Sequence, residues 1–322
     1  MKLGVFMVLF GDRSLTEALD YVAKSGLDTV EIGTGGYPGK AHCDPAELLA
    51  DKAKLRAFAQ AVQDRGLEIS ALSCHGNPLH PNAEVARQYH EDFENTVRLA
   101  AELGGLDVIT FSGCPGESDT SQNPVWVTCP WPEEFTKVLD WQWQEKVIPY
   151  WSRQHQFLQE HGVRVAIEAH PGFVVYNTET MLRLRETCGD TIGMNFDPSH
   201  LFWQGMDPVA CIKELGQKDA IFHFHAKDTA FDTRNMSLQG VLDTKSYRDE
   251  LQRSWIFRTV GYGHGEKTWR DIISALQLVG YNGTLSIEHE DSLMAVDEGF
   301  QKAVAFLKQQ VIREKHDNVW WA

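Results

Sequence analysis

Short apolar runs with strand character alternate eight times with segments of helical periodicity along this chain. Strands separated by helices pair in parallel, and eight such units close naturally into a barrel. The sequence therefore predicts an α/β fold, a (β/α)8 TIM barrel with strands inside and helices outside. The predicted strands are 3–10, 29–33, 68–76, 108–113, 164–170, 192–197, 221–228 and 284–290.

A doubly wound open sheet is the structural alternative, because it uses the same alternating units. Such sheets often carry a glycine-rich nucleotide fingerprint after the first strand, and none follows residues 3–10. The segment GTGGYPG (33–39) follows the second strand, but Pro38 interrupts it and its spacing matches neither nucleotide motif. We interpret this segment as a plain turn and favour the barrel.

Glycines close several of the predicted helices. Glycine is typical of a helix C-cap, because it adopts the left-handed conformation at little cost. These helix ends support the assignment of helices between the strands. The glycines are Gly26, Gly66, Gly104, Gly162, Gly189, Gly216 and Gly280.

The whole chain, residues 1–322, fits one barrel domain. Two segments, near 114–132 and 229–267, exceed ordinary loop length. Because both follow strands, a barrel places them at its C-terminal face, where long loops form lids or substrate walls. Their aromatic side chains are candidates for stacking on a substrate, for packing within the loops or for a subunit contact: Trp126, Trp131, Trp255 and Phe257.

The charge balance limits the classes of partner. With 30 Lys+Arg against 45 Asp+Glu, the formal net charge is -15, and nucleic-acid binding depends on basic surface that displaces counterions. We therefore expect no nucleic-acid partner. No run approaches the roughly 18 apolar residues of a membrane helix, and VFMVLF (5–10) indicates a strand rather than a signal peptide. Six cysteines without a C-x-x-C pair indicate reduced thiols. These features predict a cytoplasmic protein without a membrane partner.

Polar side chains stand near the C-terminal ends of the last four predicted strands. Residues two apart on a strand share a face, and the C-terminal ends of barrel strands carry the active site. An ionised carboxylate is costly to bury without a positive partner, so we expect a cation beside these side chains. The side chains sharing a face on each strand are Glu168 and His170; Asn195 and Asp197; His223, His225 and Lys227; and Ser286, Glu288 and Glu290.

One ligand from each of these strands gives Glu168, Asp197, His225 and Glu288. Three carboxylates and one imidazole form a hard, oxygen-rich site that suits Mn²⁺, Mg²⁺ or Co²⁺. Each residue taken singly also fits a satisfied core position or an ion pair. His223 competes with His225, and we prefer His225 because it lies nearer the end of the strand.

Two further polar residues lie on earlier strands. His75 stands at the end of the third predicted strand and is interpreted as a substrate contact or as a residue that supports the metal ligands. Glu31 on the second strand is a weaker candidate for the same kind of role.

The segments IEAHPG, NFDPSHL, HFHAKD, VGYGHG and GYNGTLSIEHED carry a family resemblance. In this order and spacing they resemble the sugar phosphate isomerase/epimerase superfamily, the xylose isomerase-like TIM barrels, over nearly the whole chain. That superfamily includes ketose 3-epimerases, hydroxypyruvate isomerases, inosose dehydratases and, more distantly, endonuclease IV. The resemblance implies one divalent ion, most often Mn²⁺, held by Glu168, Asp197, His225 and Glu288.

The resemblance also implies roles for other residues. His200 is expected to contact substrate oxygens, and His170 matches a second polar residue beside the first metal glutamate. Ketose epimerases carry an arginine shortly after the metal histidine, whereas this chain has HAKDTAF (225–231). Lys227 is therefore a candidate for a related role, and Arg258 for an approach from the lid.

A metal ion beside a general base fits removal of a proton next to a carbonyl, with an enediolate intermediate. Glu168 or Glu288 is the expected base, and the other can return a proton to the opposite face. These residues predict a metal-dependent isomerase or epimerase of a keto-sugar. Elimination from the same intermediate, with His170 or His200 as acid, would give a lyase or dehydratase acting on a keto-sugar or keto-glycoside.

Two other classes remain open. An endonuclease IV-like nuclease would need a positive DNA-binding face, which the net charge disfavours. A non-catalytic sugar-binding barrel would keep sugar affinity without turnover. The expected partner is a small-molecule sugar, and the tail VWWA (319–322) favours docking on the barrel or in a homo-oligomer.

Overall fold

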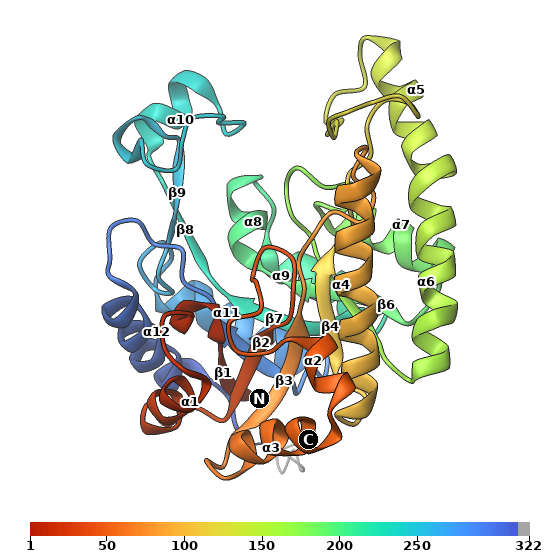
Figure 1. The fold of residues 1–322 in the computed structure, drawn as a ribbon. Coiled ribbons are helices and arrows are strands. Elements are labelled where there is room, and N and C mark those ends of the chain that lie inside the picture. The colour runs from red at the N-terminus through yellow and green to blue at the C-terminus, as the bar shows by residue number, and fades with distance from the viewer. Residues whose placement is uncertain (315–322) are drawn as a thin grey trace, which may run out of the picture.

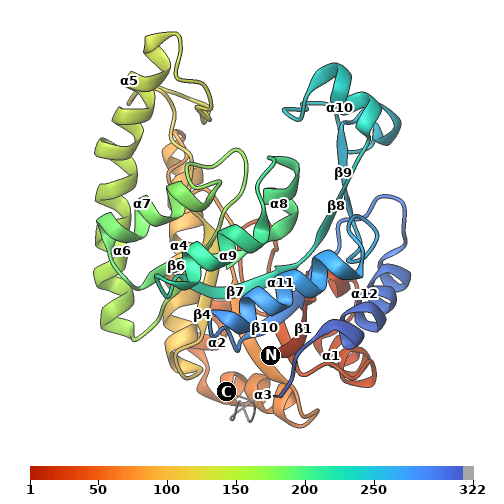
Figure 2. The same cartoon turned by 180° about the vertical axis from the view of Figure 1, so that it is seen from behind.

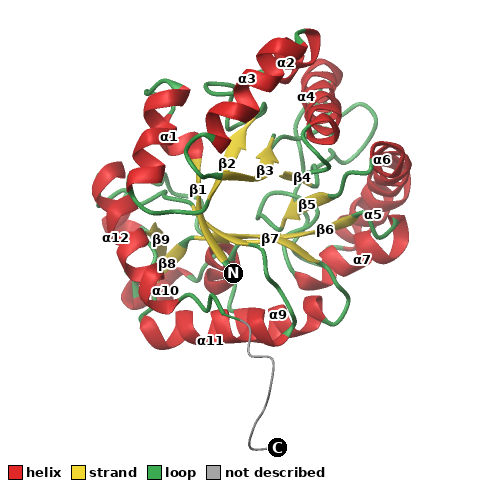
Figure 3. Cartoon of the chain, turned by 90° about the horizontal axis from the view of Figure 1, so that it is seen from below, coloured by secondary structure: helices red, strands yellow, loops and turns green. Residues whose placement is uncertain are grey.

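The computed structural model describes residues 1–314, and the tail VWWA lies outside the described residues. Its centre is a closed barrel of parallel strands in the order β1-β10-β7-β6-β5-β4-β3-β2. Figure 3 shows this barrel inside a ring of helices. The prediction of a TIM barrel is confirmed. The barrel strands are β1 (Lys2–Phe6), β2 (Thr29–Gly33), β3 (Glu68–Ser73), β4 (Asp107–Phe111), β5 (Val165–Glu168), β6 (Ile192–Phe196), β7 (Ile221–Ala226) and β10 (Thr284–Ile287).

The helices cover the barrel with amphipathic faces, so that their apolar sides and the strands share one core. Within residues 1–314, no helix combines the length and the apolar character needed to cross a bilayer. The α-helices around the barrel are α1 (Leu15–Lys24), α2 (Pro45–Ala50), α3 (Lys52–Gln63), α4 (Ala83–Glu102), α5 (Glu133–Trp141), α6 (Ile148–His161), α7 (Thr178–Cys188), α8 (Pro198–Trp203), α9 (Pro208–Gly216), α11 (Glu266–Leu278) and α12 (Val296–Gln310).

Three local predictions differ from the structure. The first strand is shorter than residues 3–10, because a 3-10 helix, η1 (Met7–Phe10), follows β1. The single helical segment that the alternating pattern predicts between the second and third strands is two helices, α2 and α3, since Asp51 is extended between them and its side chain caps α3. Gly216 is the last residue of α9 rather than a left-handed cap. A Cβ there would lie 2.4 Å from Val279, so this glycine permits close packing.

The segment 229–267 is an arm with its own secondary structure rather than a loop. Strands β8 (Asp228–Phe231) and β9 (Trp255–Arg258) pair antiparallel, and α10 (Thr233–Gln239) and a short 3-10 helix, η3 (Glu250–Gln252), lie between them. Figures 1 and 2 show this arm rising on one side of the barrel and the start of α5 rising on the other. A π-helical turn, η2 (Gln142–Val147), joins α5 to α6. The two long insertions therefore flank the C-terminal face.

Buried Asp228 fastens the base of the arm to the barrel. Its carboxylate accepts hydrogen bonds from the backbone N–H groups of Gly261, Gly263 and His264 at 3.1, 3.2 and 2.9 Å. It also accepts one from Trp269 Nε1 on α11 at 3.0 Å. The motifs HAKD and VGYGHG thus meet in one hydrogen-bond network that returns the chain from the arm to α11.

Replacing Asp228 with alanine is expected to lower the free energy of unfolding by about 3 kcal/mol or more, because several buried donors lose their acceptor. Thermal and urea unfolding measure the change. The exposed Asp12→Ala variant is the control and should unfold like the parent protein. Equal stability of the two variants would contradict the anchoring role.

Candidate active site

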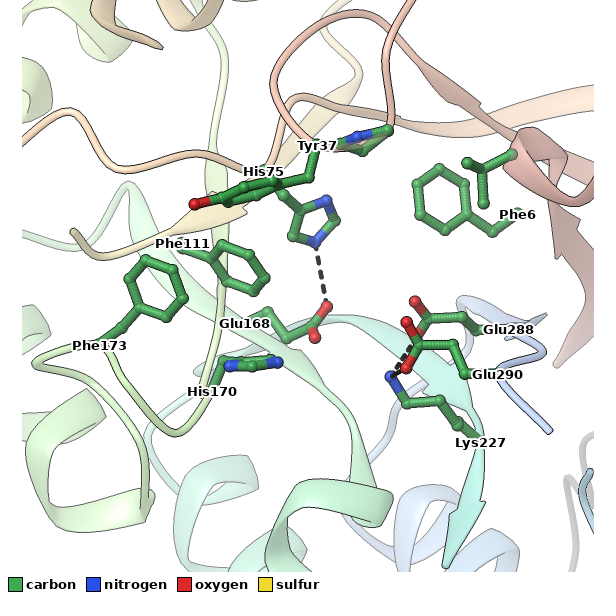
Figure 4. Close-up of a pocket in the computed structure, with 12 residues that line it drawn as sticks. Phe6, Tyr37, His75, Phe111, Glu168, His170, Phe173, Lys227, Glu288 and Glu290 are labelled. Carbon is green, nitrogen blue, oxygen red and sulfur yellow. Dashed lines mark hydrogen bonds and ion pairs between the residues drawn. The ribbon is translucent and has the colours of Figure 1, made fainter. Parts of the chain in front are cut away.

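A cavity of about 420 Å³ opens at the C-terminal ends of the barrel strands. Figure 4 shows Glu168, Glu288 and Lys227 directed into it, with the aromatic rings of Phe111 and Phe173 on one side. Its size lies in the ordinary range for small-molecule sites. The lining residues are Phe6, Val8, Tyr37, Pro38, His75, Phe111, Glu168, His170, Phe173, Lys227, Glu288 and Glu290.

Four residues that the sequence predicts as metal ligands converge beside this cavity, which Glu168 and Glu288 line. One ligand atom each from Glu168, Asp197, His225 and Glu288 lies within 4.8 Å of the others. Glu168 ends β5, Asp197 follows β6, His225 lies near the end of β7, and Glu288 follows β10. The closure of the barrel brings the four residues together, although Glu168 and Glu288 are far apart in the sequence.

Glu31, on β2, orients the imidazole of His225 from below. His225 Nε2 lies 3.0 Å from both carboxylate oxygens of Glu31, which also accepts hydrogen bonds from Ser73 and Ser286. Because a carboxylate accepts, the Nε2 proton stays between the two groups and Nδ1 faces the cavity side. Nδ1 lies 3.1 Å from Glu168 and 3.0 Å from Glu288.

Charges around the cluster set its protonation. Burial disfavours the imidazolium of His225, but Glu31 and Glu288 raise its pKa well above the usual value. For Asp197, burial disfavours the charged carboxylate and raises the pKa to about 6, although the positive charge of Lys227 opposes this shift. For Glu288, burial is outweighed by Lys227 and His225, which hold the pKa well below the usual value. The cluster therefore keeps excess negative charge at neutral pH.

Lys227 lies against the same carboxylates. Its buried Nζ is 3.0 Å from Asp197 Oδ2, 2.9 Å from Glu288 Oε2 and 3.1 Å from Glu290 Oε2. Burial opposes its charge, but Asp197 and Glu288 raise its pKa well above the usual value. One ammonium group cannot offset all the carboxylates gathered here, so a further cation is favoured.

Buried ligand atoms without a hydrogen bond test whether a cation fits. Asp197 Oδ2, His225 Nδ1 and Glu288 Oε2 are buried and make ion pairs, with Lys227 or between His225 and Glu288, but no well-formed hydrogen bond within the described chain. These atoms carry lone pairs, or a displaceable proton on Nδ1, and they belong to three of the four clustered residues. Two hard oxygens and an imidazole nitrogen aimed at one region fit a divalent ion such as Mn²⁺, Mg²⁺ or Co²⁺.

The Glu31→Gln variant is expected to weaken metal binding by about 10- to 100-fold, because it removes the charged partner that orients and polarises His225. Calorimetric titration with Mn²⁺ measures the affinity. Glu68→Gln, an exposed carboxylate at the opposite end of the barrel strands, is the matched control. Unchanged Mn²⁺ affinity in Glu31→Gln would remove this role from Glu31.

Three more histidines surround Glu168. His75 Nε2 lies 3.0 Å from Glu168 Oε2, and His200 Nε2 lies 3.3 Å from Oε1. His170 Nδ1 lies 2.6 Å from the Pro171 carbonyl oxygen, so Nδ1 carries the proton. Burial, aided by the charge of nearby His200, lowers the pKa of His170 to about 3. His170 is therefore neutral, and its Nε2 is an acceptor.

Of the remaining residues considered in the sequence analysis, some line the cavity and others lie outside it. Lys227 lines the cavity, whereas Arg258 does not, because its guanidinium pairs with Asp291 at 3.0 Å. His223 lies below the cluster, within 3.1 Å of Asn195 and 3.3 Å of Ser70. Trp131 is 77% exposed and lies outside the cavity.

The sequence did not single out one wall of the site. Tyr37 and Pro38 line the cavity, although GTGGYPG was interpreted as a plain turn. Gly36 in that turn has φ 62°, and a Cβ on it would lie 1.9 Å from the His75 carbonyl oxygen. Only glycine permits this approach, which brings Tyr37 over the cavity. The glycine pair at 35–36 was the available signal.

The fold and the clustered side chains define an α/β barrel with a candidate metal centre at its C-terminal mouth. More particularly, the chain belongs to the family described as xylose isomerase-like TIM barrel, whose model matches residues 19–310. The proposed ligands all lie inside the matched region.

Relatives and solved structures place the chain within a broad group. It is 36% identical over 314 residues to the uncharacterized protein YfiH of Bacillus subtilis (strain 168), covering 97% of this chain and 99% of that one. It resembles 3-keto-D-glucoside 4-epimerase, YcjR, from E. coli at 15% identity, with TM-score 0.65 over 96% of this chain and 99% of the other. It resembles the probable 3-DHS dehydratase AsbF from Bacillus anthracis at 18% identity, with TM-score 0.64 over 96% and 98%. At these identities the two structures show a shared fold.

Proposed function

We propose that this protein is a divalent-metal-dependent isomerase or epimerase of a keto-sugar. The observation that carries the proposal is the buried cluster of Glu168, Asp197, His225 and Glu288, three of whose ligand atoms make no hydrogen bond, beside a cavity that Glu168 and Glu288 line. The match to the xylose isomerase-like TIM barrel family, and the similarity in fold to a 3-keto-D-glucoside 4-epimerase, support it.

The four clustered residues would hold the ion, which when bound supplies Lewis-acid stabilisation to the negative charge that develops on a carbonyl oxygen. Glu168 and Glu288 both line the cavity, and both carboxyl groups have pKa values below the usual range. Burial alone would raise these values, but the adjoining histidines and Lys227 outweigh it. Both groups are therefore ionised at neutral pH and available as bases.

The remaining side chains orient the substrate. Lys227 lines the cavity as a buried ammonium group and can bind a substrate oxygen. Neutral His170 accepts a hydrogen bond from a substrate hydroxyl through Nε2. The aromatic walls formed by Phe6, Phe111 and Phe173 exclude water from the carbon that loses its proton.

A lyase or dehydratase acting on a keto-sugar or keto-glycoside is the second candidate, since it shares the proton-abstraction step. The fold of this chain also resembles that of the probable 3-DHS dehydratase AsbF. The neutral state of His170 disfavours this outcome, because a histidine whose pKa is about 3 has no proton on Nε2 to give to a leaving group at neutral pH. His200 or Lys227 would have to supply that proton.

Solvent exchange tests the proposal. The protein loaded with Mn²⁺ is incubated with keto-hexoses, keto-pentoses and methyl 3-keto-glucosides in D₂O. We expect deuterium at a carbon next to the carbonyl, and NMR of the product separates epimerisation, isomerisation and elimination. Absence of exchange into every one of these keto-sugars would refute both candidate reactions.

A further inference from the structure

A second cavity of about 240 Å³ adjoins the candidate active site. Aromatic rings from three distant parts of the chain line it: Trp126 from the loop 114–132, Trp203 from α8, and Tyr247 and Trp255 from the arm. The solvent-facing side is formed by Tyr247 and Leu242, which are 55% and 64% exposed. Because the cavity opens to solvent, it is a place for a ligand rather than a void in the core.

The two cavities meet at His170, which lines both. His200 connects them a second time. Its Nε2 lies 3.3 Å from both Glu168 Oε1 and Asp197 Oδ2, while the ring itself lines the second cavity. A molecule bound at the cluster therefore has an adjoining space for a further group.

Three buried nitrogen atoms of residues that line the second cavity lack hydrogen-bond partners within the described residues. Trp203 and His200 are 4% and 1% exposed, and Trp203 Nε1 and His200 Nδ1 make no hydrogen bond within the described residues. Trp126 Nε1 is also buried without a partner. An unpaired buried polar group costs about 1–3 kcal/mol, so a ligand with hydroxyl groups would relieve these costs whereas an alkyl chain would not.

The stacked arrangement of the rings adds a shape requirement. Trp203 and Trp255 stack with ring centroids 4.6 Å apart and planes 7° apart, and Tyr247 lies against Phe257 at 5.6 Å. Flat aromatic walls combined with unpaired N–H donors suit a sugar ring, which presents C–H groups on its faces and hydroxyl oxygens at its edges.

We propose that the substrate is a two-ring keto-glycoside, with the keto ring over the metal cluster and the second sugar ring in the aromatic cavity. This inference rests on the proposed function, because the keto ring must occupy the cavity that contains Glu168 and Glu288. It assigns the arm, the loop 114–132 and α8 a shared task, which is to recognise the ring that does not react.

Matched substrate pairs test the inference. Methyl 3-keto-β-D-glucopyranoside is compared with 3-keto-cellobiose oxidised in its non-reducing ring, and methyl 3-keto-α-D-glucopyranoside with 3-keto-trehalose. Deuterium exchange in D₂O gives kcat/KM for each. We expect the two-ring member of at least one pair to be favoured by about tenfold or more, as one well-packed ring contact provides.

Two variants ask whether the aromatic cavity causes the preference. Trp126→Phe keeps a ring but removes the unpaired N–H, and Tyr247→Ala removes a ring from the open side. In both, the ratio of two-ring to one-ring kcat/KM should fall toward one. Trp131→Ala is the matched control, because Trp131 lies on the same loop as Trp126 but lines neither cavity, and its ratio should equal that of the parent protein.

The outcomes separate this inference from the proposed function. Exchange without any two-ring preference, or a preference that both cavity variants retain, overturns the inference while the proposed function stands. If no substrate exchanges deuterium, the proposed function fails. The second cavity is then tested by itself: tryptophan-fluorescence titration compares the affinities for cellobiose and trehalose with those for the two methyl glucosides. Disaccharides that bind no better than methyl glucosides would then overturn it, and tighter binding abolished in Trp126→Phe would support it.

Discussion

Stripping the protein of divalent metal is expected to slow deuterium exchange into a keto-sugar by at least about a thousandfold, because a Lewis acid contributes several kcal/mol to stabilising the developing charge. The measurement compares protein dialysed against a chelator with the same protein after Mn²⁺, Mg²⁺ or Co²⁺ is added back singly. Elemental analysis confirms the metal content of each sample.

A stability measurement accompanies the rate. The three carboxylates of the cluster gather around Lys227 and His225, so an added divalent ion should bind the folded state and raise the unfolding temperature. Exchange that continues at the full rate in metal-free protein would contradict a metal-dependent mechanism. A metal-induced rise in unfolding temperature without any effect on rate would assign the ion a structural role.

The barrel and its converging strand ends could be predicted from the sequence for a local physical reason. Side-chain direction alternates along a strand, so Glu168 and His170, or His223 and His225, must share a face. Closure of eight parallel strands then fixes where those faces meet. The convergence of Glu168 with Glu288 needed no information beyond strand order and strand ends.

The arm could not be predicted in the same way. Strand β8 follows β7 after a single residue, Lys227, so that the run IFHFHAKDTAF has no glycine or proline to mark where the barrel strand ends. Its partner β9 lies more than twenty residues further along, and only tertiary packing determines their pairing. A long segment with mixed polarity therefore resembled a loop.

The aromatic cavity lay beyond sequence analysis for a different reason. Trp126, Trp203 and Trp255 are far apart in the chain, and each alone is typical of ordinary packing. The unpaired Nε1 atoms are visible only when every neighbour is placed. Tyr37 shows the same limit, because its position depends on the contact between Gly36 and the backbone of His75.

Glu168→Gln and Glu288→Gln are each expected to lower the rate of epimer or isomer formation by about 100- to 10,000-fold, because each keeps the shape of the side chain but removes a base. Rates are measured at saturating Mn²⁺, with metal occupancy checked, since both residues are also proposed ligands. Glu290→Gln is the matched control. Its side chain is 50% exposed and touches Lys227 from outside the cluster, so its effect should stay below about tenfold.

The two variants should differ from each other if the carboxylates act on opposite faces of the substrate. The variant that loses the first base should neither exchange deuterium nor form product. The variant that loses the second should still exchange the original proton through the remaining base, while the inverted product fails to appear. Equal loss of exchange in both variants, with metal bound, would instead place both carboxylates in one proton-transfer step. Full turnover in either variant would remove that residue from the mechanism, because a glutamine amide cannot accept the proton.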